Sequence, residues 1–528
     1  MTTGTPAKTR TYDLIGFGDE VPGVLAIVSA VREHRRRTGK TLRTLMLFKG
    51  NSQQGLGGHL VRGGLAYLDR ANVPLEVRQS LGLATFGDPS AIYKEFLQRV
   101  GVTQVALDPR QADKVLRKML SESGTDILSR VQIQSIITRG PAIAGIRLAN
   151  GETFMAKQFI DSTVNAELAQ SAGVRKLPGF GTFGLPDSEL PVTLVFETEG
   201  LSISRLKEVE FNYLKRFTNP SDTEAQRFLA IAAGGDPALI DQFRRSFTNT
   251  QGGLRTMFVG LDHIDVLSRV LTITYHAFRG KKAALKESGV LMDCPNIAIL
   301  PGGRLSWNAL LFYVGGSQAE ALARGAARPT AAMLEEMTFV EKWLKSFGAS
   351  VVRATPELYI RHAGNILDVM EPLSGAEMLA GGVPASEAIA TFGYHLDVRG
   401  GITGLGAKAS GMGIGSISFH APPLFNVGIH HAQVRSVPNL AVISPGSGFE
   451  GYACAAGRIV EFNVAVGQGI GIAASLAIET NRPIAAVSNV EVRQVLAQTG
   501  LLSRIYGRSN ATEASRLLAF ESSMIAIA

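Results

Sequence analysis

The sequence predicts an α/β protein whose main domain is a parallel sheet covered by helices, with a second, α+β domain inserted into it. Three observations support this prediction: a β-α-β pattern at the start of the chain, a strand–helix pair near its end, and a long middle stretch of different character. With 528 residues, 45% of them hydrophobic, the chain is long enough for about two to four domains.

The N-terminal pattern runs strand, loop, helix, strand. Residues 12–15 are expected to form a strand, followed by the loop GFGDEVPG. Residues 21–31 have the length and spacing of a helix, and Pro22 suits its first turn. The continuous apolar run at residues 42–48 is typical of a buried parallel strand.

Later segments extend this plan. Asp108 followed by Pro109 marks a helix start, and Asn150-Gly151 supplies the tight turn of a hairpin within a small β-meander. Residues 439–445 and 457–478 are expected to form a strand and a long helix of small residues. The predicted domains are residues 8–185 with 425–485 (nucleotide-binding), 186–424 (inserted substrate domain, with a helix at 331–347) and 486–528 (C-terminal helical extension).

Charge and composition exclude several classes of protein. The net charge is +8, but the clearest basic run, Arg35-Arg36-Arg37, closes a helix without aromatic interleaving, so we expect a solvated face and no nucleic-acid partner. No apolar run approaches the ~20 residues of a membrane span, and the first residues lack the apolar centre of a secretory signal. With only Cys294 and Cys454, the chain fits a reducing compartment, the cytoplasm.

The loop after the first strand has the residues of a nucleotide site. Gly16 and Gly18 permit a tight turn and let backbone N–H groups face a pyrophosphate at the positive end of the following helix. A second pair, Gly57-Gly58, follows the next strand. Ordinary turn glycines are the alternative. A further glycine-rich stretch at residues 400–415 indicates unusual backbone angles or close approach of chain to ligand, with a flexible loop as the alternative.

With these motifs and LGGHLVRGG, the chain resembles the bacterial FAD-dependent oxidoreductases that have a two-dinucleotide-binding-domain flavoprotein fold and an inserted substrate domain. The likeness continues in ETFMAKQFIDSTVNAELAQSAG, LYIRHAGNILDV, YHLDVRGG and VPNLAVISPGSGFEGYACAAGRIVEFNVAVGQGIGIAASLA. The resemblance implies a Rossmann-like FAD/NAD(P)-binding domain, FAD as the cofactor and a small-molecule substrate.

The same resemblance assigns cofactor contacts to particular residues. It implies that the loop glycines approach the FAD pyrophosphate, that Asp161 lies in the turn closing the nucleotide domain, and that a glycine-rich helix start points at the flavin. Close helix packing is the alternative for that last group. The implied contacts are Gly16, Gly18, Gly23, Lys49, Gly57, Gly58, Asp161, Gly467, Gly469 and Gly471.

Four departures from the family pattern fall on these places. Asp19 and Glu20 interrupt the glycine loop, and carboxylates repel a pyrophosphate, so either the insertion bulges outward, the phosphates shift, or the dinucleotide is no longer bound. The ribose-binding acid at the end of the second strand is replaced by Phe48-Lys49. Either the turn at residues 51–54 substitutes for it, or Lys49 contacts a phosphate such as the 2′-phosphate of NADP; an ordinary surface lysine is the alternative. Val164 and the turn ISPGSG also differ from the usual residues.

Candidate catalytic residues are histidines and arginines. Histidine titrates in the useful range, and a guanidinium can clamp a carboxylate substrate in a bidentate manner. Structural histidines and packing-level ion pairs are the alternatives. The candidates are His59, Arg361, His362, His395 and Arg399. His420, His430 and His431 have no carboxylate or cysteine at ligand spacing, so no metal is expected.

Together these features predict an FAD-dependent oxidoreductase that transfers a hydride between a small organic substrate and the flavin. Two alternatives stay open. A two-domain NAD(P)-dependent dehydrogenase is favoured by Lys49, and a non-catalytic binding or assembly protein that has lost the cofactor is favoured by the four departures. Neither the oligomeric state nor the substrate follows from the sequence.

Overall fold

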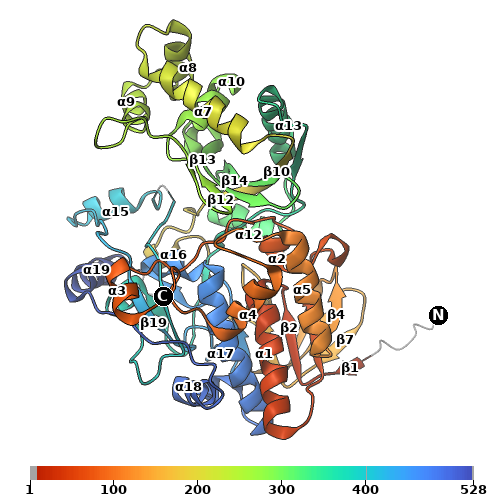
Figure 1. Cartoon of the computed structure of the whole chain (residues 1–528). Helices are drawn as coiled ribbons and strands as arrows, with labels where there is room; N and C mark the ends of the chain where they lie inside the picture. The colour runs from red at the N-terminus through yellow and green to blue at the C-terminus, as the bar shows by residue number, and fades with distance from the viewer. Residues whose placement is uncertain (1–8, 400, 526–528) are drawn as a thin grey trace.

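A five-stranded parallel sheet forms the centre of the lower body in Figure 1. The computed structural model describes residues 9–399 and 401–525. Every neighbouring pair of strands in this sheet is parallel, and strands from both ends of the chain contribute. The order is β20 (Leu440–Val442), β8 (Gln158–Asp161), β2 (Leu14–Phe17), β3 (Thr44–Phe48), β4 (Asp126–Ser129).

Two long helices, α1 (Val21–Thr38) and α17 (Val460–Glu479), lie side by side against this sheet (Figure 1). Helix α1 follows β2, has Pro22 in its first turn and ends at Gly39 in the left-handed conformation. The three predicted terminal arginines lie in its last turn. Among the described residues, α17 alone is long and apolar enough to cross a membrane, and it is wholly buried as a core helix.

A β-meander covers the face of the parallel sheet opposite α1 and α17. Its strands are β1 (Thr9–Thr11), β7 (Thr153–Met155), β6 (Ala142–Leu148) and β5 (Ile133–Arg139). Residues 149–152 join β6 to β7, as the Asn-Gly turn predicted, and helix α5 (Pro109–Glu122) begins where Asp108 caps it by accepting from the Arg110 amide.

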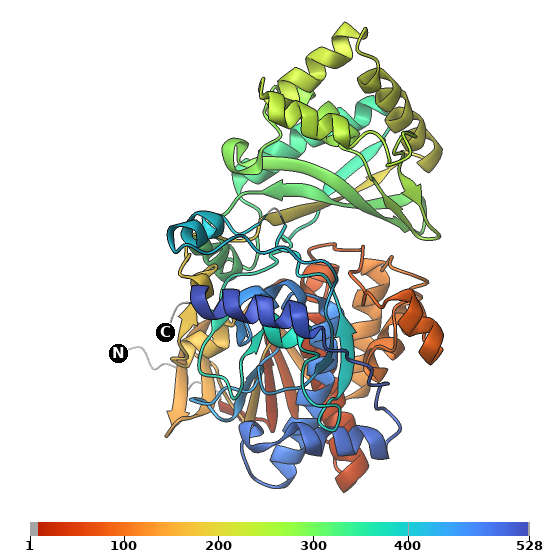
Figure 2. The same ribbon diagram turned by 90° about the vertical axis from the view of Figure 1, so that its left-hand side faces the viewer.

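The upper body is a six-stranded antiparallel sheet backed by helices on the side away from the lower body (Figure 2). The strands in order are β11 (Phe258–Val259), β12 (His263–Asp265), β13 (Val290–Leu300), β14 (Arg304–Phe312), β10 (Val192–Glu199) and β15 (Val351–Ala354). The helices are α7 (Ile203–Thr218), α8 (Thr223–Ala233), α9 (Pro237–Arg245), α10 (Val270–Arg279) and α13 (Ala331–Ser346). The predicted fold class, α/β with a β-meander and an α+β insertion, is confirmed.

The inserted body ends earlier than the predicted boundary at residue 424. Its sheet spans residues 192–354, whereas α14 (Gly375–Leu379), β18 (Ala390–Gly393) and β19 (Leu424–Val427) contribute to the same hydrophobic core as α1 and α17. Scattered aromatic residues in the sequence indicate that a second domain is present. They do not show in which of the two bodies each aromatic side chain is buried, so they do not locate the boundary.

The remaining segments are short. The C-terminal extension forms α18 (Asn489–Gln498) and α19 (Ala511–Met524). In the glycine-rich stretch, residue 400 lies outside the described residues, as does the predicted leader at residues 1–8. A Cβ added at Gly406, Gly411 or Gly415 meets nothing within 4 Å, so close approach of the chain does not explain these glycines.

Candidate active site

The loop between β2 and α1 approaches the end of β8 very closely. Gly18 has φ +95°, and a Cβ placed on it would lie 2.7 Å from the Thr163 amide nitrogen. A Cβ at Gly23 would lie 2.2 Å from Ser162 Oγ, which itself donates to the Gly18 carbonyl at 2.7 Å. Gly16, in contrast, lies inside β2, where a Cβ would meet the Ile27 side chain of α1 at 2.7 Å. Gly18 and Gly23 therefore shape the loop, and Gly16 serves strand–helix packing.

The Asp19 carboxylate is buried and is held by groups of the second glycine loop. It accepts from the amides of Gly57 at 3.0 Å and Gly58 at 3.4 Å, and its Oδ1 lies 2.8 Å from Arg62 Nη2. Burial favours the neutral acid, but Arg62 and the two amides outweigh it and hold the pKa of Asp19 below its usual value. Asp19 is thus a charged group enclosed by the site that was expected to hold phosphates.

The Glu20 carboxylate also accepts hydrogen bonds from the second glycine loop. Glu20 is the N-cap residue of α1, and its carboxylate accepts from the His59 amide at 3.2 Å. Its Oε2 also lies 2.5 Å from His59 Nδ1. The His59 ring stacks on Tyr359 with centroids 5.1 Å apart, and its Nε2 is buried without a hydrogen-bond partner.

Arg62 joins the two glycine loops to the inserted segment. Besides Asp19, its guanidinium donates to the Gly55 carbonyl at 2.9 Å and pairs through Nε with Glu357 at 2.6 Å. One positive charge therefore faces two buried carboxylates, Asp19 and Glu357. Burial, opposed by Arg62 but reinforced by Asp19 and Glu20, raises the pKa of Glu357 to about 7, so this acid keeps its proton through mildly acidic pH.

The space at this end of the sheet is small. A cavity of about 70 Å³ adjoins Gly18, Lys49 and Glu167, and another of about 10 Å³ lies between His59 and the start of α17. Pockets for cofactors usually measure roughly 300–1,000 Å³. The donors present, Arg62 and the amides of Gly57–His59, fit a diphosphate in kind, but Asp19 and Glu20 already occupy them. A diphosphate reaches these donors only after the carboxylates leave them.

Lys49, expected at a phosphate or ribose, is engaged within the chain. Its Nζ lies 2.6 Å from Glu167 Oε1 and donates to the Arg324 carbonyl at 2.8 Å. The neighbouring turn is a short 3-10 helix, Ser52–Gln54, capped by Asn51, whose side chain accepts from the Gln53 amide. The missing ribose acid is therefore not replaced by a free cation.

Asp161 ends β8 and is fully buried. It accepts from the Thr163 amide at 2.9 Å, the Thr163 hydroxyl at 2.7 Å and the Ala169 amide at 3.0 Å. Burial, partly offset by these bonds, raises its pKa to about 6. Asp161 thus organises the turn that the resemblance implied, ahead of helix α6 (Glu167–Ser171).

The predicted helix start at the third glycine group is wrong. Gly467, Gly469 and Gly471 lie in the middle of α17, which begins at Val460. A Cβ at Gly467 would be 2.7 Å from the Pro22 carbonyl, and one at Gly471 2.3 Å from the Ala26 carbonyl. Gly467 and Gly471 therefore allow α17 to pack on α1, and Gly469 allows it to pack on Ile389 and Ile429, so close helix packing, the alternative stated above, explains them. The start at Val460 agrees instead with the helix predicted from the sequence over residues 457–478.

A second charged cluster lies beside the start of α17. The Arg458 guanidinium is buried and donates to Tyr359 Oη at 3.2 Å and to Asp397 Oδ2 at 3.3 Å. Arg361 lies over the Tyr359 ring at 4.6 Å, and Arg399 Nε lies 3.6 Å from Asp397. Of the predicted catalytic residues, the structure therefore brings His59, Arg361 and Arg399 around Tyr359 and Asp397.

Two predicted catalytic histidines do not join them. His362 is fully buried, with Nδ1 2.8 Å from Glu189 Oε1 and Nε2 2.8 Å from Asn365 Oδ1, so both ring nitrogens are occupied. His395 is exposed and contacts Asn72 at 2.9 Å. Within the described part of the chain, no group of three metal-ligating side chains occurs.

A cavity of about 430 Å³ adjoins the second cluster, between the inserted sheet and the segment after β18. It is lined by Pro191, Arg269, Lys286, Asp293, Tyr313, Asp397 and Arg399, among others. Its size lies within the range of small-molecule sites. Arg62, Glu357, Tyr359, Asp397 and Arg458 were not among the predicted site residues, although all of them except Glu357 lie in the motifs quoted for the family resemblance.

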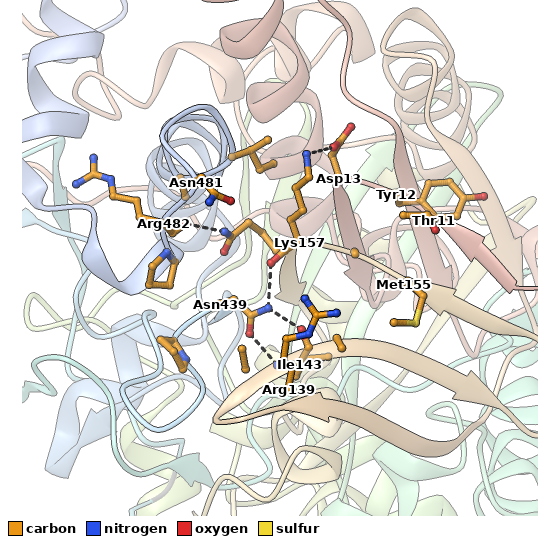
Figure 3. Close-up of a pocket in the computed structure, with 18 of the residues that line it drawn as sticks. Thr11, Tyr12, Asp13, Arg139, Ile143, Met155, Lys157, Asn439, Asn481 and Arg482 are labelled. Atoms are coloured by element: carbon orange, nitrogen blue, oxygen red, sulfur yellow. Dashed lines mark hydrogen bonds and ion pairs between the residues drawn. The ribbon is translucent and has the colours of Figure 1, made fainter.

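A hollow of about 810 Å³ lies at the opposite end of the parallel sheet (Figure 3). Its polar groups pair with one another: Lys157 with Asp13 at 2.8 Å, and the Asn439 amide with the Ile143 and Lys157 carbonyls. Ligands of open parallel sheets bind at the carboxyl ends of the strands, whereas this hollow adjoins their amino ends. Its volume alone does not make it the active site.

Comparison with known proteins agrees with the fold. The sequence profile of the FAD dependent oxidoreductase family matches residues 23–496. No curated protein matches the chain. Solved structures with low similarity include a geranylgeranyl bacteriochlorophyll reductase-like protein from Thermoplasma acidophilum (11% identity, 98% of each chain covered, TM-score 0.36) and PqsL, a probable FAD-dependent monooxygenase from Pseudomonas aeruginosa (9% identity, 98% of this chain and 97% of that one, TM-score 0.34). These scores carry no functional argument. FAD is the cofactor of the matched family, and a profile match over nearly the whole length establishes that the chain belongs to the FAD dependent oxidoreductase family.

Proposed function

We propose that the protein is an FAD-dependent oxidoreductase that passes a hydride between a small organic substrate and the flavin. The observation that carries the proposal is the 430 Å³ cavity, whose wall includes Asp397. Asp397 pairs with Arg458, and Arg458 also lines the small cavity at the start of α17 together with His59. Asp397 and Arg458 thus connect a substrate-sized cavity to the start of α17 in the nucleotide-binding fold.

The residues that would hold FAD follow from the donors present. Gly18 and Gly23 would keep the loop close to β8, and Arg62 with the amides of Gly57 and Gly58 would bind the diphosphate once Asp19 has released them. When bound, FAD supplies the hydride chemistry, so the protein is left to position substrate and to move protons.

His59 is the residue best placed to move a proton. Its Nδ1 faces the Glu20 carboxylate, which favours the tautomer with the proton on Nδ1 and leaves Nε2 as an acceptor. Nε2 has no hydrogen-bond partner among the described residues, and stacking on Tyr359 fixes the ring. His59 would therefore accept or hold a proton at Nε2, oriented by Glu20 as a carboxylate orients a catalytic imidazole.

Titration of the purified protein with FAD tests the proposal. We expect saturable binding, seen as quenching of flavin fluorescence, and its loss in Gly18→Asp, whose carboxylate would lie against Thr163. A Gly16→Ala variant serves as the matched control, since Gly16 packs against α1 away from the loop. Equal FAD binding by wild type and a folded Gly18→Asp variant would contradict the assignment of the loop.

A second candidate function is a non-catalytic binding or assembly role for a chain that has lost the cofactor. The occupation of the phosphate donors by Asp19 and Glu20 favours it specifically. It predicts no FAD binding by wild type or by an Asp19→Asn, Glu20→Gln double variant. Location in the cytoplasm is also proposed, supported by the two unpaired cysteines, Cys294 and Cys454.

A further inference from the structure

Four arginines are buried in the described part of the chain: Arg62, Arg304, Arg361 and Arg458. Three of them face carboxylates, since Arg62 pairs with Asp19 and Glu357, Arg304 with Asp108 and Glu197, and Arg458 with Asp397. Arg361, 1% exposed, has no carboxylate within the 4.0 Å ion-pair distance among the described residues. A buried cation without a counterion is unfavourable, so this position calls for an anion.

The hydrogen bonds of Arg361 do not supply that charge. Its Nη1 donates to the Pro191 carbonyl at 2.8 Å and its Nη2 contacts Asn308 Oδ1 at 3.4 Å, while its Nε has no partner. Burial and the nearby Arg399 and Arg458 lower the pKa of Arg361 to about 10, in keeping with an excess of positive charge around it.

The cavity of about 430 Å³ is separated from this guanidinium by Pro191, which lines the cavity and accepts a hydrogen bond from Arg361. Five cations and four carboxylates belong to the cavity wall and the cluster behind it, counting the Asp69 carboxylate 3.9 Å from Arg458. The cations are Arg269, Lys286, Arg361, Arg399 and Arg458; the carboxylates are Asp69, Glu189, Asp293 and Asp397. In this set the cations outnumber the carboxylates by one.

We propose that this cavity binds a small carboxylic acid as the substrate of the proposed oxidoreductase, held by Arg399 on the wall, with Arg361 balancing its charge from behind Pro191. Arg399 is suited to the contact because its present partners are distant, Asp293 at 3.5 Å and Asp397 at 3.6 Å. The cavity volume lies near the lower end of the roughly 300–1,000 Å³ range of small-molecule sites, which suits a small acid better than a larger ligand.

The test is calorimetric titration of the full-length protein with succinate, pyruvate and benzoate, each compared with its neutral amide. At least one acid is expected to bind about tenfold or more tightly than its amide, as a charge-assisted contact predicts. Arg399→Gln and Arg361→Met are each expected to remove about tenfold of that affinity. Arg304→Gln, a buried arginine with its own carboxylates, is the matched control and should leave acid binding unchanged.

Acids and amides binding alike, or an Arg361→Met variant that keeps the full acid affinity, would overturn the proposal. The assay contains no FAD, so acid binding without any FAD binding would support the anion site while removing the oxidoreductase function. FAD binding without acid binding would overturn the anion site while leaving the oxidoreductase function supported. Arg361→Lys, which restores the charge, should recover most of the affinity if charge and not shape is what Arg361 supplies.

Discussion

Arg62 and Arg361 are buried to the same degree but have opposite surroundings. Arg62 faces Asp19 and Glu357, so the chain itself provides more negative charge than the guanidinium needs. Arg361 faces a carbonyl, an amide oxygen and an aromatic ring, and no described carboxylate pairs with it. A sequence motif alone therefore does not identify an open binding site, because the loop that carries the nucleotide motif is already neutralised from within.

Removing Arg62 should have the largest effect. Arg62→Met leaves Asp19 and Glu357 buried without their cation, and breaking a buried ion pair in this way typically costs about 3–5 kcal/mol. Urea denaturation monitored by circular dichroism measures the loss. A free energy of unfolding within about 1 kcal/mol of wild type would show that the pairs around Arg62 contribute little to the fold.

Glu357 should give a distinctive pH dependence. Its pKa is about 7 in the folded protein and near 4.5 in the unfolded chain. A raised folded-state pKa contributes stability that is fully present below pH 4.5 and is lost as the pH rises through 7, by roughly 3 kcal/mol in total.

Asp161 and Glu521 also titrate in this window, with pKa values of about 6 and about 7, so the informative quantity is the difference between wild type and Glu357→Gln. That difference in unfolding free energy should change steadily between pH 4.5 and 7.5. A difference in unfolding free energy that does not change with pH would contradict the raised pKa of Glu357.

The carboxylate of Glu20 should weaken FAD binding. Glu20→Gln keeps the side-chain shape but removes the charge next to the His59 amide, and we expect FAD affinity to rise about fivefold, or about 1 kcal/mol. Fluorescence titration measures it, with Glu335→Gln on the exposed face of α13 as the control. Weaker FAD binding in Glu20→Gln would mean that the carboxylate helps to hold the cofactor.

Arg361→Met should have the smallest effect on stability, within about 1 kcal/mol of wild type and in the stabilising direction, because an apolar side chain replaces a buried cation without a counterion. Thermal unfolding measured alongside Arg62→Met tests the contrast directly. A loss similar to that of Arg62→Met would mean that the carbonyl and amide partners satisfy Arg361 fully.

Local signals predicted much of the fold. Pro22, the Asp108 cap and the Asn150-Gly151 turn act over a few residues, so their positions along the chain suffice. The site depended on contacts between distant residues: Arg62 meets Glu357 across 295 positions and Arg458 meets Tyr359 across 99. Asp19 and Glu20 were recognised as unusual, but their partners were not, because one sequence does not reveal which cation neutralises which acid.

The parallel sheet has a consequence for how the protein is made. Strand β8 ends at Asp161, but its neighbour β20 begins only at Leu440, and the glycine-lined partner of α1 follows later still. At about 5–20 residues per second, a ribosome leaves that sheet edge and the apolar face of α1 uncovered for roughly 15–60 s. The inserted body, whose sheet is complete by residue 354, can fold during that interval. Nascent chains arrested before residue 440 should therefore need chaperones that protect apolar surface, and those arrested after residue 480 should not.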